Sequence, residues 1–235
     1  MAKQDVHNIT VLEESLGYSF KDKELLLKAL THKSFHHERP KISPSHNERL
    51  EFLGDSVLGL IVVEYLFKHD KSYSEATMSK MKSYLVKESV LSDVAGGIGL
   101  GLHVRLGKGE EETGGREKKS ILANTIEAVF GAIYSDGGYD EARKAVLRLL
   151  MRKMDMALSS EQFFDFKTDL QEESQLRFGV LPEYRVVKQE GEEHKKIFTV
   201  EVFIRDDKLG QGTGRSKKEA ETLAAKEALL KMREP

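Results

Sequence analysis

Apolar residues recur at every third or fourth position from residue 9 to about residue 153. This spacing places them on one side of a helix and predicts a series of amphipathic helices. Gly17 is expected to end the first of these. The later helices are predicted over residues 48–68, 74–87, 89–98, 120–136 and 140–157. Polar segments at 36–46 and 107–119 are predicted to be loops, the second of them mobile. The pattern therefore predicts an all-α domain over residues 1–157.

The pattern changes after this domain, where a polar segment at 158–165 is expected to be a linker. The residues beyond it first show helical spacing and then alternate between apolar and polar positions, as strands do. We predict a helix, three strands and a closing helix over residues 167–178, 183–188, 197–205, 208–214 and 217–232. The order α-β-β-β-α over residues 166–235 indicates a small α+β domain, so the expected fold is an all-α domain followed by an α+β domain.

The composition limits where the protein acts but does not identify its partner. The chain has 235 residues, with 37 basic and 39 acidic side chains and a formal net charge of −2, so any affinity for a polyanion must come from local patches. The absence of cysteine excludes disulfides and thiolate metal sites and fits a reducing cytoplasm. No apolar run reaches the length of a membrane span, and the first residues lack the features of a signal peptide. We expect a cytoplasmic protein with no membrane partner.

Three acidic residues stand in the apolar segment from Asn47 to Leu60. Glu48, Glu51 and Asp55 are spaced i, i+3 and i+7, which places them within about 60° of arc on one helix face. Apolar residues cover almost every other direction, so the helix is expected to be buried. Unpaired carboxylates in such a helix cost several kcal/mol and need a compensating cation.

A second predicted helix, over residues 120–136, carries Asn124 and Glu127 on one face among apolar residues. Two such helices can meet and hold a hard cation, and Mg²⁺ favours a few carboxylates completed by water and phosphate oxygens. The sequence has no His or Cys cluster with ligand spacing, so zinc is not expected. Other roles remain open at this stage: Glu48 can complement the dipole of its helix, and Arg49 can pair with a neighbouring acid.

The run Asn47-Glu-Arg-Leu-Glu-Phe-Leu-Gly-Asp55 resembles the signature of the ribonuclease III family. The resemblance implies that Glu51, Asp55 and Glu127 bind the catalytic metal, Mg²⁺ or Mn²⁺ in its place, and that Glu48 helps to hold the site. Glu75 matches a family acid near the scissile strand, although an ordinary surface position remains equally open.

One position departs from the family pattern. Where the family has Asp in Ala-Asp-x-x-Glu-Ala, this chain has Asn124, which keeps an oxygen donor but loses a negative charge. The hypothesis is that the site binds metal more weakly and that activity survives. The alternative is a duplex-RNA-binding protein whose nuclease site is weakened or inactive.

The C-terminal segment resembles the double-stranded RNA-binding domain along its full length, which implies recognition of A-form shape and ribose hydroxyls. A Lys-Lys pair at a helix start is by itself typical of a solvated face, but its place after an α-β-β-β frame favours phosphate binding. The matching positions are Thr168, Gln171 and Glu172 in the first helix, His194 and Lys195 in a loop, and Arg215, Lys217 and Lys218 at the last helix.

Together these resemblances imply an endoribonuclease that hydrolyses double-stranded RNA, leaving 5′-phosphate and 3′-hydroxyl ends, in the processing of ribosomal and other structured precursor RNA. They also imply a homodimer and no organic cofactor, with Phe52 and Leu53 as candidates for the dimer surface.

His32 is expected to pack or to bond its own loop. The glycine-rich run at 107–115 lacks the ending and the preceding strand of a phosphate-binding loop. The C-terminal domain argues against a small-molecule hydrolase.

Overall fold

The computed structural model describes residues 3–70, 73–192 and 196–233. The chain forms two compact units, residues 1–161 and 162–235. Among the described residues, the regular structure of the first unit consists of helices and an isolated bridge between Thr31 and Arg105, and the second unit is an α-β-β-β-α domain, as the pattern predicts. None of the described helices is long and apolar enough to cross a membrane.

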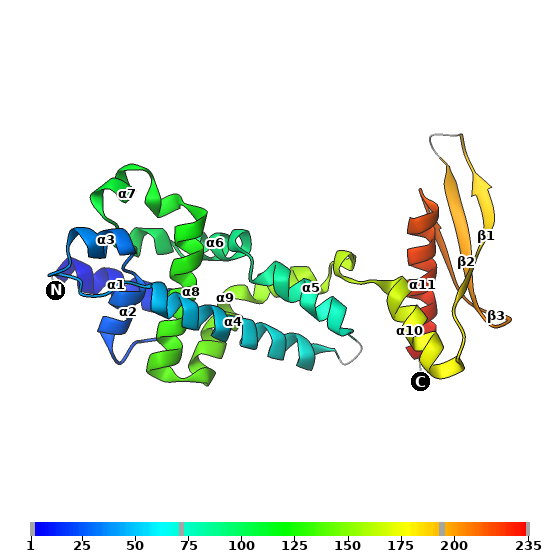
Figure 1. Ribbon diagram of the computed structural model, residues 1–235, viewed down its shortest axis with the longest axis horizontal. Helices are drawn as coiled ribbons and strands as arrows, with labels where there is room; N and C mark the ends of the chain where they lie inside the picture. Colours follow the sequence, from blue (N-terminus) through cyan, green and yellow to red (C-terminus); the bar gives the residue numbers. More distant parts are fainter. Residues whose placement is uncertain (1–2, 71–72, 193–195, 234–235) are drawn as a thin grey trace. The chain divides into compact units, whose positions relative to one another are not determined.

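Figure 1 shows the helices of the first unit. In chain order they are α1 (Lys3–Leu16), α2 (Lys23–Ala29), α3 (Lys33–Glu38), α4 (Glu48–His69), α5 (Glu75–Leu85), α6 (Glu88–Gly97), η1 (Leu100–His103), α7 (Lys108–Glu112), η2 (Gly115–Glu117), α8 (Lys119–Gly137) and α9 (Tyr139–Leu158). The 3₁₀ turn η3 (Glu161–Phe163) follows them. Gly17 follows α1 with a φ of 71°, as expected for a glycine that stops a helix.

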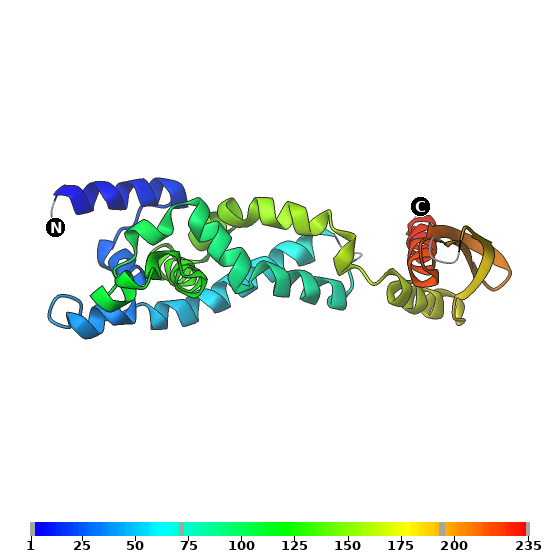
Figure 2. The same cartoon turned by 90° about the horizontal axis from the view of Figure 1, so that it is seen from above.

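Helices α4 and α8 cross in the centre of the first unit (Figures 1 and 2). At the crossing, a glycine of each helix faces the backbone of the other. A Cβ atom on Gly54 would lie 1.7 Å from the carbonyl oxygen of Glu127, and one on Gly131 would lie 2.2 Å from the carbonyl oxygen of Leu50. No other residue type allows the two backbones to approach this closely. Fully buried side chains such as Leu58 of α4 and Phe130 of α8 add to the core, each with about 1.5–3 kcal/mol of burial.

The expectation that α4 is buried on all sides is wrong. One apolar face is exposed, at spacings of three, four and eight residues: Phe52 is 80% exposed, Phe67 68%, Leu60 57% and Val63 40%. We call these four residues the α4 stripe. A helix that is apolar on all faces is expected to be covered on all faces. The sequence pattern does not show whether the covering residues belong to the same chain or to another molecule.

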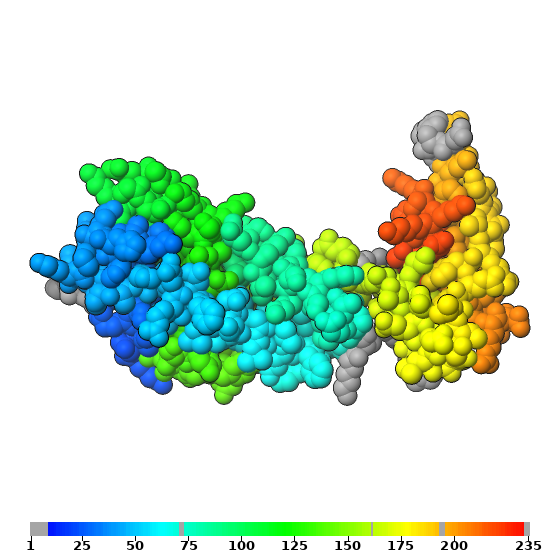
Figure 3. Space-filling view, in the orientation of Figure 1, coloured from blue at the N-terminus to red at the C-terminus, as the bar shows by residue number. Residues whose placement is uncertain are grey.

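The polar segment at 107–119 is more regular than predicted, because it contains α7 and η2. The segment at 36–46 is a loop as predicted, except that residues 36–38 belong to α3. Two hydrogen bonds join α7 to α3, because the amide of Gly107 donates to Ser34 Oγ at 2.9 Å and that of Lys108 donates to Glu38 Oε2 at 2.9 Å. The space-filling view shows the green segment that contains α7 directly above the blue segment that contains α3 (Figure 3).

The second unit contains α10 (Phe166–Phe178), β1 (Glu183–Glu190), β2 (Ile197–Ile204), β3 (Asp207–Gly214) and α11 (Lys217–Arg233). The strands form an antiparallel sheet in the order β1-β2-β3, with an irregularity in β1 between Val186 and Lys188. Arg205, in the tight turn between β2 and β3, has a φ of 57°.

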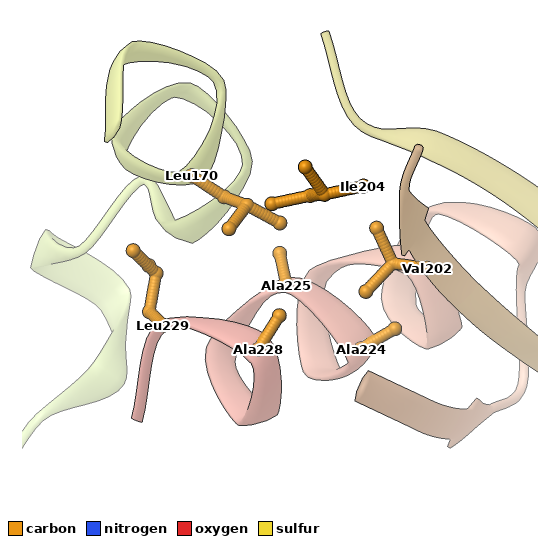
Figure 4. Close-up of a cluster of buried hydrophobic side chains, with 7 residues drawn as sticks. All are labelled: Leu170, Val202, Ile204, Ala224, Ala225, Ala228 and Leu229. Carbon is orange, nitrogen blue, oxygen red and sulfur yellow. The ribbon is translucent and has the colours of Figure 1, made fainter. Parts of the chain in front are cut away.

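Glycines on β3 allow α11 to lie close against the sheet. A Cβ atom on Gly212 would lie 2.2 Å from the carbonyl oxygen of Ala220, and one on Gly210 would lie 2.3 Å from that of Ala224. Figure 4 shows the hydrophobic cluster that results, in which side chains of α10, β2 and α11 meet. Its buried members are Leu170, Val202, Ile204, Ala224, Ala225, Ala228 and Leu229.

Candidate active site and RNA-binding surface

The crossing of α4 and α8 brings the predicted acidic residues of the two helices into one region. Gly54 stands between Glu51 and Asp55 on α4, and it lies directly against the backbone of Glu127 on α8. Glu51 and Glu127 are half-buried, whereas Asp55 and Asn124 are exposed at the same place. The carboxylates therefore lie at the edge of the helix interface, where one side is protein and the other is open to a ligand.

The acidic side chains influence one another across the interface. Burial, together with the charges of Asp55 and Glu51, raises the pKa of Glu127 from its ordinary 4.5 to about 7. Burial also raises the pKa of Glu51, together with the charges of Glu48 and Asp55, while Lys33 and a hydrogen bond from the Asn124 amide oppose that rise. Mutual repulsion of this kind requires that the carboxylates face a common space.

Glu48 lies in the first turn of α4 and has a cationic partner. Its Oε1 is 3.1 Å from Nζ of Lys33, and its Oε2 is 3.8 Å from Nδ1 of His46. The hydrogen bond from Lys33 holds the pKa of Glu48 below its ordinary value. Glu48 is exposed, so the expectation of a buried, uncompensated carboxylate is wrong for this residue.

The donor set fits a hard divalent cation. All four candidate ligands, Glu51, Asp55, Asn124 and Glu127, offer oxygen, which Mg²⁺ and Mn²⁺ prefer. Across the described residues, however, no three His, Cys, Asp or Glu side chains are already grouped as a metal-binding set. The helices thus place the oxygen donors in one region, but side-chain rotation has to complete any coordination shell.

Lys33 is the residue of this region that the sequence patterns did not single out. It lies at the first position of α3, next to His32, whose ring caps α3 through contacts with Ser34. In the segment Thr31-His-Lys-Ser34, only His32 has a predicted role, and no local pattern distinguishes Lys33 from other surface lysines. Only the packing of α3 near the start of α4 shows that Lys33 reaches Glu48.

Glu75 lies at the start of α5 and is exposed. Its carboxylate accepts a hydrogen bond from Ser79 Oγ at 2.7 Å, which is a local contact within the same helix. The contacts of Glu75 do not link it to the acids of α4 and α8, so its predicted place near the scissile strand stays a prediction.

The predicted RNA-binding side chains of the second unit lie on two elements. Thr168, Gln171 and Glu172 are exposed on α10, and Arg215, Lys217 and Lys218 are exposed at the start of α11. His194 and Lys195 lie outside the described residues. The start of α11 is fixed by Ser216 and Glu219, because Ser216 Oγ accepts from the amide of Glu219 at 3.1 Å and the Glu219 carboxylate accepts from the amide of Arg215 at 2.7 Å.

The first unit is all-α, and its two acidic helices cross. It is followed by an α-β-β-β-α domain with basic residues at the start of a helix. This is the organisation of a nuclease that acts on duplex RNA. Residues 22–154 match the family model described as Ribonuclease-III-like, and residues 166–232 match the Double-stranded RNA binding motif. The chain belongs to the ribonuclease III family. It is an endoribonuclease of double-stranded RNA that processes ribosomal RNA precursors.

Similar proteins share this organisation over nearly the full length. The chain is 43% identical to Ribonuclease 3 of Syntrophotalea carbinolica over 225 residues, which cover 96% of this chain and 97% of that protein. It is 46% identical to Ribonuclease 3 of Caldanaerobacter subterraneus subsp. tengcongensis over 225 residues, covering 95% and 98%. The crystal structure of the nuclease domain of ribonuclease III from Campylobacter jejuni aligns with a TM-score of 0.57 and 44% identity, covering 62% of this chain and 95% of that one. A second structure of that domain concerns a region involved in its dimer formation.

Proposed function

We propose that the crossing of α4 and α8 is the cleavage site and that Glu51, Asp55, Asn124 and Glu127 hold Mg²⁺ there, with Mn²⁺ as a substitute. The observation that carries the proposal is the close contact of α4 and α8 at Gly54, across which the charges of Asp55 and Glu51 help to raise the pKa of Glu127. When bound, the divalent ion supplies a nucleophilic water and offsets the charge that develops on the phosphate.

The side chains of the chain have distinct roles in this proposal. Glu127 must give up its proton before it can act as a ligand, because its pKa lies at about 7. Glu48 stays ionised beside Lys33 and holds the entrance of the site. The hydrolysis leaves a 5′-phosphate and a 3′-hydroxyl. We place this reaction in the cytoplasm, with no organic cofactor.

For RNA recognition, we propose that α10 contacts ribose hydroxyls in a minor groove through Thr168, Gln171 and Glu172. Arg215, Lys217 and Lys218 contact phosphates from the start of α11, where their charges add to the positive end of the helix dipole. His194 and Lys195 are proposed to enter a second minor groove. The exposure of the described members leaves each of them accessible to a duplex.

Replacing Lys217 and Lys218 by Ala together is expected to weaken duplex binding about tenfold or more at low salt. Each lysine that contacts a phosphate releases a counterion, so the slope of log K against log salt should become less steep by about one to two. A salt titration of duplex binding measures both effects. Lys144→Ala on α9 is a control for the loss of a surface lysine, and an unchanged slope in the double variant would contradict the assignment.

We propose further that the protein is a homodimer and that the α4 stripe is the surface that a second copy covers. Four large apolar side chains, 40–80% exposed, lie along one helix beside the site, and exposed apolar surface of this kind marks an interface. Leu53, the other predicted member, is only half exposed. Sedimentation equilibrium of the full chain is expected to give the mass of two chains, and the mass of one chain at micromolar concentration would count against it.

Asn124→Asp is expected to lower the Mg²⁺ concentration needed for half-maximal cleavage by about tenfold, because it restores a negative charge among the ligands. Cleavage of a long RNA duplex across a Mg²⁺ titration is the measurement. The unchanged protein should already cleave at high Mg²⁺. If it is inert at high Mg²⁺ and Mn²⁺ and only Asn124→Asp restores activity, the proposed site is inactive in this chain, and duplex binding alone is the better description.

A further inference from the structure

Lys33 brings a positive charge to the acidic site from a different helix. Its Nζ lies 3.1 Å from Oε1 of Glu48. The same ammonium group lines one cavity with Glu51, and its charge opposes the rise of the Glu51 pKa. Lys33 is therefore not the partner of one surface acid but a cation beside two neighbouring residues of the acidic face of α4.

A cavity of about 190 Å³ adjoins this pair. Its lining includes Lys33 of α3, Glu48 and Glu51 of α4, and Asn124 of α8. The cavity thus contains two acids and the lysine that neutralises part of their charge, together with the asparagine that replaces the family aspartate. The ammonium group of Lys33 and a divalent ion at the proposed site act on the same carboxylates.

Two features reduce the negative charge of the site in this chain. Asn124 contributes no charge where the family pattern has an acid, and Lys33 offsets one of the charges of Glu48, Glu51, Asp55 and Glu127. Carboxylates gathered at one site repel one another, and partial burial adds to the cost for Glu51 and Glu127. A lysine close to these carboxylates lowers this cost in free energy before a metal ion binds.

We infer that Lys33 is an internal counter-cation of the acidic site, which positions Glu48 before metal binding and competes with the divalent ion for the carboxylates. The inference rests on the proposed metal site at the α4–α8 crossing. A divalent ion held by these ligands would repel the ammonium group of Lys33 and weaken its pairing with Glu48. Lys33 is a positioning residue in this scheme, because it acts through the glutamates.

The exposure of Lys33 and Glu48 limits how strongly Lys33 can compete with a metal ion. The side chains of Lys33 and Glu48 are 55% and 49% exposed, so water screens much of their interaction. Removing one positive charge from beside the proposed ligands of a divalent ion is expected to tighten metal binding by about threefold to tenfold. A purely structural role for Lys33 predicts the opposite sign or no change.

The test is direct Mn²⁺ binding to the full chain without RNA, followed by electron paramagnetic resonance. Lys33→Gln is expected to lower the dissociation constant threefold to tenfold, and Lys33→Arg, which keeps the charge, should bind like the unchanged protein. Lys144→Gln removes a comparable exposed pair with Glu141 on α9 and is the matched control. A Mg²⁺ titration of the unchanged protein should also shift the side-chain NMR signals of Lys33, which tests the weakened pairing with Glu48 without any substitution.

The outcomes separate this inference from the proposed function. If the unchanged protein binds no Mn²⁺, the metal site itself fails and the inference with it. If the unchanged protein binds Mn²⁺ and Lys33→Gln binds it equally or more weakly, only the inference is overturned. Weaker binding of metal-free Lys33→Gln to duplex RNA, with an unchanged Mn²⁺ constant, would make Lys33 a phosphate contact and would also overturn it.

Discussion

Glu127→Gln is expected to reduce the cleavage rate of duplex RNA by about 10³-fold, because it removes one preorganised charge from the place where charge develops in the reaction. The substitution keeps the shape and one oxygen donor of the side chain, so the α4–α8 packing should survive. Single-turnover cleavage of a long RNA duplex at saturating Mg²⁺ is the measurement. Duplex binding in the presence of Ca²⁺ should be nearly unchanged, since α10 and α11 supply the proposed RNA contacts.

The matched control is Glu141→Gln on α9, which removes a carboxylate that pairs only with an exposed lysine in the described contacts. This variant is expected to cleave at the rate of the unchanged protein. A Glu127→Gln variant that retains more than about a tenth of the activity would show that the α8 acid is not part of the cleavage site, provided that its folding is intact.

The same substitution should change how stability depends on pH. The pKa of Glu127 is about 7 in the folded, metal-free protein and 4.5 in its ordinary state. Between these values the folded chain binds more protons than the unfolded chain, so this group makes stability fall as pH rises from about 4.5 to 7. Allowing for screening of a half-exposed group, the loss is about 1–2 kcal/mol. The difference in unfolding free energy between Glu127→Gln and the unchanged protein should show this dependence, and added Mg²⁺ should remove it.

Much of the fold follows from local patterns along the chain. The 3.6-residue period placed α4, α8 and α9 nearly at their observed bounds, and alternation placed β1 and β2. The exceptions are segments whose order depends on distant partners. The segment at 107–119 lacks a strong period, and its helix α7 is attached to α3 by hydrogen bonds from Gly107 and Lys108 that no local pattern encodes.

The candidate site was predicted in part, and for a similar reason. Spacing placed Glu48, Glu51 and Asp55 on one face, but it assigned them to a buried environment, whereas Glu48 and Asp55 are exposed. The periodicity shows which positions are apolar. It does not show which of these positions are exposed in a single chain. Lys33 was missed because its significance is a tertiary contact with Glu48. The RNA-binding role of Lys217 and Lys218 stays a prediction.

The approach of α4 to α8 is the feature on which the proposed chemistry most depends, and it can be tested at Gly54. A Cβ atom there would lie 1.7 Å from the carbonyl oxygen of Glu127, a rigid backbone atom. Gly54→Ala is therefore expected to force the helices apart and to lower the free energy of unfolding by about 3 kcal/mol. Denaturant unfolding measures this loss.

The matched control lies one and a half turns further along the same helix. A Cβ atom on Gly59 would meet only the end of the flexible Lys82 side chain, at 3.6 Å. Gly59→Ala should therefore gain about 0.5–1 kcal/mol from helix propensity. The two alanine variants are thus expected to change stability in opposite directions.

Cleavage should fall in Gly54→Ala even under conditions where the variant is fully folded, because the shift moves Glu127 away from Glu51 and Asp55. If folded Gly54→Ala cleaves at the normal rate, the acids of the two helices do not act at one site.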